Sequence, residues 1–116
     1  MATVTEQLVA ICNAMGGLLR EACGRGPSRC SAHWAGPDLL VVLLYGGFTA
    51  AEQTLCEGGG GAAVRASRLA LKDVLEPRMT ALVEGLTGRE VTAFMSMSHQ
   101  DPDYQLEAFV LASEGA

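Results

Sequence analysis

Two cysteines, two arginines, two glycines and a proline fall within eight residues of this chain, in the segment Cys-Gly-Arg-Gly-Pro-Ser-Arg-Cys at 23–30. Thiols bind metals or attack electrophiles, and arginines beside glycine backbone N–H groups bind anions. No Gly-Lys-Ser/Thr follows, so the segment is not a phosphate-binding loop of that type. It is either a turn between two elements or a surface that binds a partner or a small anion. Its candidate binding residues are Gly24, Arg25, Gly26, Pro27 and Arg29.

The four cysteines do not have the spacing of a zinc site. Structural zinc sites carry close pairs such as Cys-x₂-Cys, whereas Cys12, Cys23, Cys30 and Cys56 are 11, 7 and 26 residues apart. Cys12 and Cys23 would lie about 16 Å apart on a helix, too far for a disulfide. Cys23 and Cys30 bracket the loop and could approach one another. We expect free thiols that pack as small residues, no metal and no cofactor; a redox or metal role is the alternative.

Three further polar residues are candidates outside this segment. Thr49 and Glu52 could form a hydroxyl–acid pair, but their spacing is that of a capping box, so we interpret them as a structural cap. Arg68 falls in an apolar helical stripe, where an arginine is costly unless it is paired. Glu52 or Glu107 is the expected partner, and both an ion pair and a ligand contact remain open for Arg68. His33 and His99 are interpreted as surface residues, and no nucleophile–histidine arrangement is visible.

The elements that must position these residues follow from hydrophobic periodicity. Thr3 and Glu6 fit a capping box at the start of the first helix, and Gly88 is a structural cap that ends the last one. Pro77 is expected to kink or split the last helix, because proline removes a backbone donor. Helices are predicted at 3–22, 49–56 and 62–87, and strands at 29–35, 39–45, 89–98 and 104–112.

The residue patterns also predict which side chains share a face. The long helix is expected to bury a stripe of residues spaced three or four apart: Val64, Arg68, Leu71, Leu75, Met79, Leu82 and Leu86. Alternation in the third strand places Val91, Ala93, Met95 and Met97 on one face, opposite Thr92, Phe94, Ser96 and Ser98.

The predicted order is α-β-β-α-α-β-β. Two hairpins flanking helices indicate a four-stranded antiparallel sheet with helices packed mainly on one face, an α+β fold in a single domain over 1–116. The strand at 39–45 is apolar on both faces, so it is covered on both sides, and the two covers need not come from one chain. This pattern, with the alternating last hairpin, predicts a homodimer.

Composition excludes several classes of protein. With 49% hydrophobic and 18% charged residues, the chain is not a disordered tail. A net charge of −5 disfavours nucleic-acid binding, which needs clustered cations. The longest apolar run, Leu39–Tyr45, is far shorter than the about 20 residues of a membrane span, so no direct membrane insertion is expected. The first residues lack the features of a signal peptide, which predicts a cytoplasmic protein.

Several short landmarks in order resemble the MpsC-like family over about residues 4–112. They are Gly24-Arg25-Gly26-Pro27 after a helix, Thr49-Ala-Ala-Glu52-Gln-Thr-Leu55, Arg68, Leu86-Thr87-Gly88 before Val91, and Phe109-Val110-Leu111. Gln53 departs from the pattern, which has a basic residue after the glutamate. The resemblance implies association with membrane ion or inorganic-carbon transport and implies no established catalytic residues.

We therefore expect a non-enzymatic cytosolic accessory or regulatory domain that acts by dimerisation and partner binding, as a possible component of a membrane transport complex. The alternative is a sensor that binds an anion or nucleotide at the Arg25 and Arg68 surface. A thiol-dependent enzyme is the third and least supported class.

Overall fold

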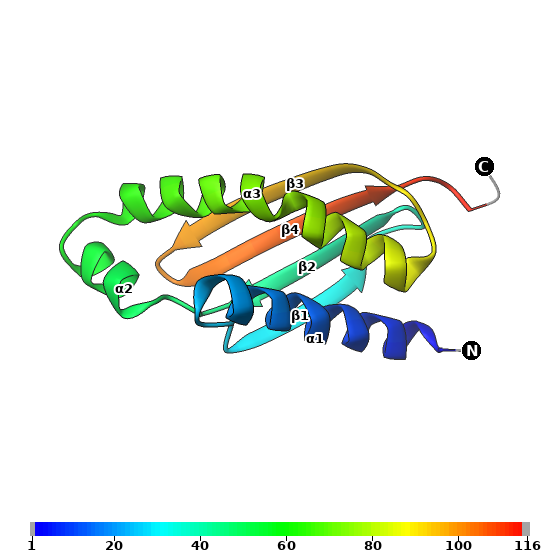
Figure 1. The fold of residues 1–116 in the computed structure, drawn as a ribbon, viewed down its shortest axis with the longest axis horizontal. Coiled ribbons are helices and arrows are strands. Elements are labelled where there is room, and N and C mark those ends of the chain that lie inside the picture. Colours follow the sequence, from blue (N-terminus) through cyan, green and yellow to red (C-terminus); the bar gives the residue numbers. More distant parts are fainter. Residues whose placement is uncertain (1, 115–116) are drawn as a thin grey trace.

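The computed structural model describes residues 2–114, which form three helices and one four-stranded antiparallel sheet (Figure 1). The elements are α1 (Val4–Cys23), β1 (Arg29–Trp34), β2 (Leu39–Tyr45), α2 (Ala50–Glu57), α3 (Gly61–Thr87), β3 (Val91–Gln100) and β4 (Asp103–Leu111). This order confirms the predicted α-β-β-α-α-β-β arrangement and the α+β class. None of the helices formed by residues 2–114 has both the length and the hydropathy that crossing a bilayer requires.

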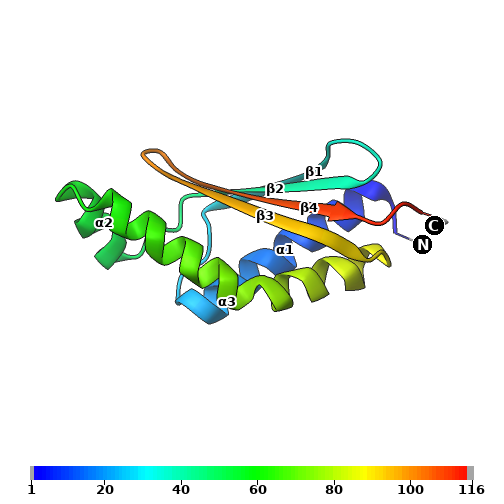
Figure 2. The same ribbon diagram turned by 90° about the horizontal axis from the view of Figure 1, so that it is seen from above.

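The sheet joins an N-terminal and a C-terminal hairpin through its two central strands. The strand order is β1-β2-β4-β3, and every neighbouring pair is antiparallel. At the central seam Leu43 of β2 lies opposite Leu106 of β4. Seen from above, α1 and α3 lie against the same face of the sheet (Figure 2). We call this the inner face and the opposite one the outer face.

Helix α1 is defined by local signals at both ends. The Thr3 hydroxyl accepts a hydrogen bond from the Glu6 backbone N–H at 3.1 Å, which satisfies one free donor of the first turn. Gly24 ends the helix with φ 76°, a conformation that glycine adopts without steric cost. Between them Ile11 and Met15 are fully buried against the inner face.

Of the two outcomes predicted for Pro77, a kink or a split, the split does not occur, because helix α3 continues through Pro77. The helix axis changes direction about halfway along in Figure 1, as a kink would produce. Proline removes one hydrogen bond, but Leu75 and Met79 on either side of it are buried in the core and hold both halves in place. Past the proline the buried stripe passes through Val83, while Leu86 is 39% exposed, contrary to the prediction. A helix with 3.6 residues per turn drifts away from a strict three-and-four spacing.

Strand β3 differs from the predicted alternation at its start. The register shifts between Val91 and Ala93, so Thr92 is an extra residue and Val91 lies on the inner face, against the core. The predicted grouping of Val91 with Met95 is therefore wrong. The strand also continues to Gln100, which places His99 in β3 instead of in the predicted turn.

The two faces of the sheet carry different side chains. The inner face holds the core residues Leu40, Val42 and Phe109, each with no exposed surface. The outer face, which no helix of the described chain covers, follows from the strand register and the alternation of burial. It consists of Arg29, Ser31, His33, Leu39, Val41, Leu43, Tyr45, Ala93, Met95, Met97, His99, Tyr104, Leu106, Ala108 and Val110.

Candidate binding pocket

A pocket of about 260 Å³ opens on the inner side of the molecule, at the end near α2. Its walls come from the C-terminal half of α1, the loop after it, the end of β2 and the turn that follows, the start of α2, α3 as far as Met79, and β4. The lining combines apolar side chains with polar ones. The residues used below are Leu19, Cys23, Arg25, Glu52, Ser67, Arg68, Leu71, Lys72, Leu75 and Gln105.

Glycines let three backbone segments meet beside this pocket. A Cβ on Gly26 would lie 2.6 Å from Cγ of Arg20 and 3.1 Å from the carbonyl oxygen of Gly16, so a side chain there would clash with α1. Gly47 has φ 96°, and a Cβ on it would lie 3.2 Å from the Gly26 carbonyl oxygen. The loop after α1 is therefore held between α1 and the turn after β2. This backbone contact places Arg25 and Pro27 in the pocket lining.

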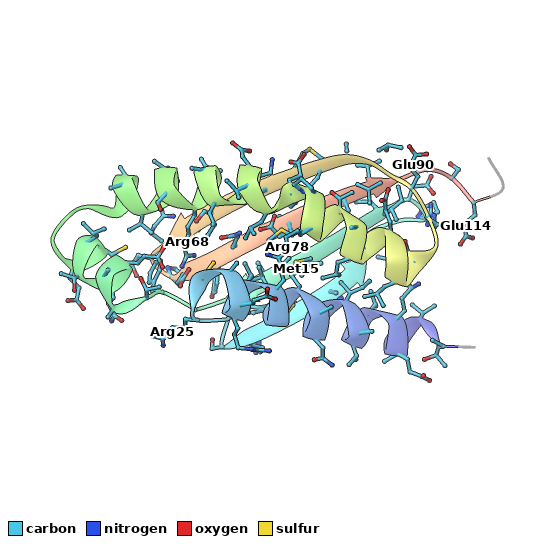
Figure 3. All side chains as sticks on the ribbon, viewed as in Figure 1. Met15, Arg25, Arg68, Arg78, Glu90 and Glu114 are labelled. Atoms are coloured by element: carbon cyan, nitrogen blue, oxygen red, sulfur yellow. The ribbon has the colours of Figure 1, made fainter. Side chains whose placement is uncertain are left out.

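Arg68 is fixed by two carboxylates from distant parts of the chain. Its Nε donates to Glu52 Oε2 at 3.1 Å, and its Nη1 donates to Asp103 Oδ1 at 2.7 Å. Its guanidinium carbon lies 4.6 Å from the centre of the Phe48 ring, a cation–π contact. Figure 3 shows Arg68 directed from α3 toward the sheet. Glu52 is one of the two expected partners; Glu107 is not a partner, and Asp103 was not foreseen.

The capping box at the start of α2 is part of the same network. The Thr49 hydroxyl accepts from the Glu52 backbone N–H at 3.1 Å, and the Glu52 carboxylate accepts from the Thr49 backbone N–H at 3.0 Å. Burial alone would raise the pKa of Glu52, but the hydrogen bonds from Arg68 and from Thr49 outweigh it and leave that pKa lowered. Glu52 therefore stays ionised and binds both a helix N-terminus and Arg68.

The structure separates the two arginines of the 23–30 segment. Arg25 lines the pocket, and Figure 3 shows it at the periphery, beside the end of α1. Arg29 lies at the start of β1 on the outer face, with its guanidinium carbon 4.0 Å from the centre of the Tyr45 ring. The two side chains do not face a common ligand. Gly24 and Gly26 shape the backbone and do not line the pocket.

A buried carboxyl that sequence reasoning did not single out as a site lies next to the pocket lining. Glu107 has no exposed surface, and its Oε2 has no hydrogen-bond partner among the described residues. Its Oε1 accepts from the side-chain amide of Gln105, which does line the pocket. Burial raises the pKa of Glu107, while Gln105, Ser96 and the nearby Lys72 lower it by less. The sequence does contain one sign of this burial: Glu107 alternates with the apolar residues Phe109 and Leu111, which share its face of β4.

The cysteines are placed differently from the expectation. Cys30 approaches Cys12, not Cys23: the two sulfur atoms are 3.0 Å apart, between β1 and α1. Cys23 lines the pocket, and burial raises its pKa. Within residues 2–114, no three His, Cys, Asp or Glu side chains are grouped so that they could hold a metal ion.

Comparison with known proteins gives one finding. The model of the family described as "Na+-translocating membrane potential-generating system (MpsC)" matches residues 4–113. Neither the curated proteins nor the solved structures contain a match to this chain. The pocket described above brings together three segments that are landmarks of the resemblance: Arg25 to Pro27, Thr49 to Glu52, and Arg68.

Proposed function

Because this chain belongs to the MpsC family, we propose that it is a non-enzymatic cytoplasmic accessory component of a Na⁺-translocating, membrane-potential-generating system and that it acts as a homodimer. The observation that carries the proposal is the uncovered apolar outer face of the sheet. The transport link rests on the family alone. The mutual pairing of Arg68, Glu52 and Asp103 supports a non-enzymatic role, because each of these charged groups is paired with another of the three.

The outer face has the composition of an interface. Leu43 lies beside Leu106 and Val41 beside Ala108 at its centre, and Met97 is 70% exposed. Large exposed apolar patches mark interaction sites in soluble proteins. The face carries no Asp or Glu, so pairing two copies through it would bury no unpaired carboxylate. Its one arginine, Arg29, lies on the edge strand β1 against the Tyr45 ring, away from the centre of the face.

The size of the outer face suits a second copy of the chain. The strands have 6, 7, 10 and 9 residues, at about 3.3 Å per residue along a strand and about 4.8 Å between strands. The projected area of the face is therefore about 500 Å², and the relief of its side chains adds accessible surface. A standard interface buries about 800 Å² per partner, so the whole face fits one stable two-fold contact.

Sedimentation at micromolar concentration tests the dimer. We expect the wild-type chain to be dimeric and Met97→Asp to be monomeric, because an aspartate would be buried without a partner. Val74→Asp is the matched control: Val74 is 73% exposed on α3, away from the sheet. A wild-type monomer, or equal dissociation of both variants, would remove the homodimer from the proposal.

A gene deletion in the native cell tests the transport link. We expect the deletion to lower Na⁺ extrusion and membrane potential, and we expect Val74→Asp but not Met97→Asp to restore them. Undisturbed Na⁺ extrusion and membrane potential in the deletion strain would contradict the accessory role. If Met97→Asp restored Na⁺ extrusion and membrane potential as well as Val74→Asp does, the outer face would have no part in the function.

A further inference from the structure

We propose that the inner pocket binds a small organic anion with a short apolar body, which lies between α1 and α3 while its anionic group meets Arg25. This inference does not depend on the proposed dimer, because the pocket lies on the opposite side of the sheet.

Only one cation of the pocket is left to attract an anion. The lining carries the cations Arg25, Arg68 and Lys72 and one carboxylate, Glu52. Two carboxylates outside the lining pair with it: Asp103 pairs with Arg68, and Glu76 pairs with Lys72. The site as a whole therefore carries no excess of positive charge, and its attraction for an anion comes from Arg25.

Arg25 is the cation that is available to a ligand. All three nitrogens of Arg68 donate to Glu52 or Asp103, and these bonds use four of its five N–H groups, so Arg68 mainly orders the wall. Lys72 pairs with Glu76 at 2.8 Å. Among the ion pairs of residues 2–114, none involves Arg25. The exposed guanidinium is preorganised for a carboxylate by its planar donor geometry, with no partner to displace.

The apolar part of the lining favours a ligand with a hydrocarbon body over an inorganic ion. Leu19 of α1 and Leu71 and Leu75 of α3 all line the pocket, and these side chains offer no hydrogen bonds to bicarbonate or phosphate. A hydrocarbon body that replaced water there would be stabilised by its burial. The volume of about 260 Å³ lies just below the common range of ligand pockets, which begins at about 300 Å³, so the body must be short.

Calorimetric titration of the full chain with linear carboxylates tests the proposal. Across butanoate, hexanoate and octanoate we expect the affinity to rise about fourfold per methylene, and then to level off when the pocket is full. Octylammonium, octanol and bicarbonate are the controls, and we expect each to bind far more weakly than octanoate. Equal binding of octylammonium, or binding of bicarbonate as tight as that of octanoate, would overturn the proposal.

Three variants locate the binding. Arg25→Ala should weaken octanoate about fivefold, the size of an exposed ion pair. Arg65→Ala, which removes the same charge from the exposed side of α3, should not change the affinity. Ser67→Trp, at an exposed position of the pocket rim, should block entry and abolish binding. Unchanged binding in both Arg25→Ala and Ser67→Trp would show that the carboxylates bind elsewhere.

Thiol labelling gives a readout that does not depend on stability. Cys23 lines the pocket whereas Cys56 lies on α2 outside it, so octanoate should slow the labelling of Cys23 by maleimide and leave that of Cys56 unchanged. Peptide mass spectrometry distinguishes the two sites. Equal rates at Cys23 with and without octanoate would contradict occupancy of the pocket.

Discussion

The two faces of the sheet are nearly equally apolar, but only one of them is covered by its own chain. On β4 the neighbours Phe109 and Val110 show the difference: Phe109 has no exposed surface, and Val110 is only half-buried. The inner face is stabilised by α1 and α3. The outer face has the same kind of side chains without the cover, which is the pattern of a surface that is completed by association.

The inner face is itself divided along its length. Near the N-terminal half of α1 the contact between helix and sheet is apolar, and Ile11 of α1 is fully buried there. Nearer to α2, Arg68 of α3 pairs with Asp103 of β4, and Glu107 of β4 is buried. Charged groups are costly in such a place unless they are paired. The pocket lies in this polar half, so the costly buried charges are found beside a place where a small molecule can enter.

Phe109→Ala and Val110→Ala test the contrast between the faces most strongly. We expect Phe109→Ala to lower the free energy of unfolding by about 4 kcal/mol, because it leaves a cavity under α3. Val110→Ala should lower it by less than about 1 kcal/mol, because Val110 is only half-buried. Chemical denaturation at two protein concentrations measures both. A Val110 effect that grows with concentration would report the dimer, whereas equal effects for the two variants would contradict the contrast.

Arg68→Ala tests the polar half of the inner face. Removing the arginine leaves Glu52 and Asp103 without their shared partner, so we expect a loss of about 3 kcal/mol at neutral pH. The folded-state pKa of Glu52 is lowered, so its share of the stability is present above its ordinary value of 4.5 and is lost as pH falls through the folded value. Burial raises the pKa of Asp103 in spite of Arg68, so Glu52 is the partner that carries this loss in acid. The loss measured for Arg68→Ala should therefore shrink in acid, and a loss independent of pH would contradict this account.

Cys12 and Cys30 test how firmly α1 is attached to the inner face. With oxidised glutathione as the oxidant we expect a Cys12–Cys30 disulfide: the two thiols give up two hydrogens, and the glutathione disulfide is reduced to two thiols. The reaction should be slow near neutral pH, because burial and the Cys12 contact raise the pKa of Cys30.

The disulfide should raise the free energy of unfolding by about 2 kcal/mol, since it closes a loop in the unfolded chain. Intact-mass and peptide mass spectrometry detect it, with Cys56→Ser as a control that still forms it and Cys30→Ser as one that does not. A disulfide between Cys23 and Cys30 instead would contradict the geometry.

Glu107→Gln is the smallest change. The raised pKa means that the carboxyl holds its proton more tightly in the folded state, so stability is full below 4.5 and falls as pH rises through the folded pKa. We expect Glu107→Gln to gain about 1 kcal/mol at pH 8 and nothing at pH 4, because an amide needs no ionisation. Glu90→Gln, at an exposed carboxylate, is the control. If the two variants had the same free energy of unfolding at pH 8, the buried carboxylate of Glu107 would not destabilise the protein.

Local signals made much of the fold predictable. The capping box at Thr49 and Glu52 depends on residues three apart, so the sequence contains the whole motif. The apolar run at 39–45 has the same bounds as β2. Both faces of this strand are apolar, so the run is continuous and its two ends are visible in the sequence. The extra residue at Thr92 has no glycine or proline to mark it, and it reversed the predicted face of Val91.

The candidate pocket was only partly predictable, since it depends on pairing between distant segments. Arg68 was recognised because a charge in an apolar stripe needs a partner, and Glu52 was one of two carboxylates considered. Asp103 became the second partner only through the β2–β4 pairing, which carries it next to the turn at Gly46. The same pairing directs Glu107 inward. No short-range sequence pattern specifies the order of the strands. The position of Asp103 beside Arg68 could therefore not be predicted from the sequence.

The order of the strands has a consequence for synthesis on the ribosome. Strand β2 is in the middle of the finished sheet, but its second neighbour is β4, which is made more than 50 residues later. Until β4 is synthesised, the apolar side chains of β2 and one row of its backbone N–H and C=O groups are exposed and can pair with other chains. The nascent N-terminal hairpin is therefore the stage at which this protein is most prone to aggregate, until residues 103–111 emerge and close the seam.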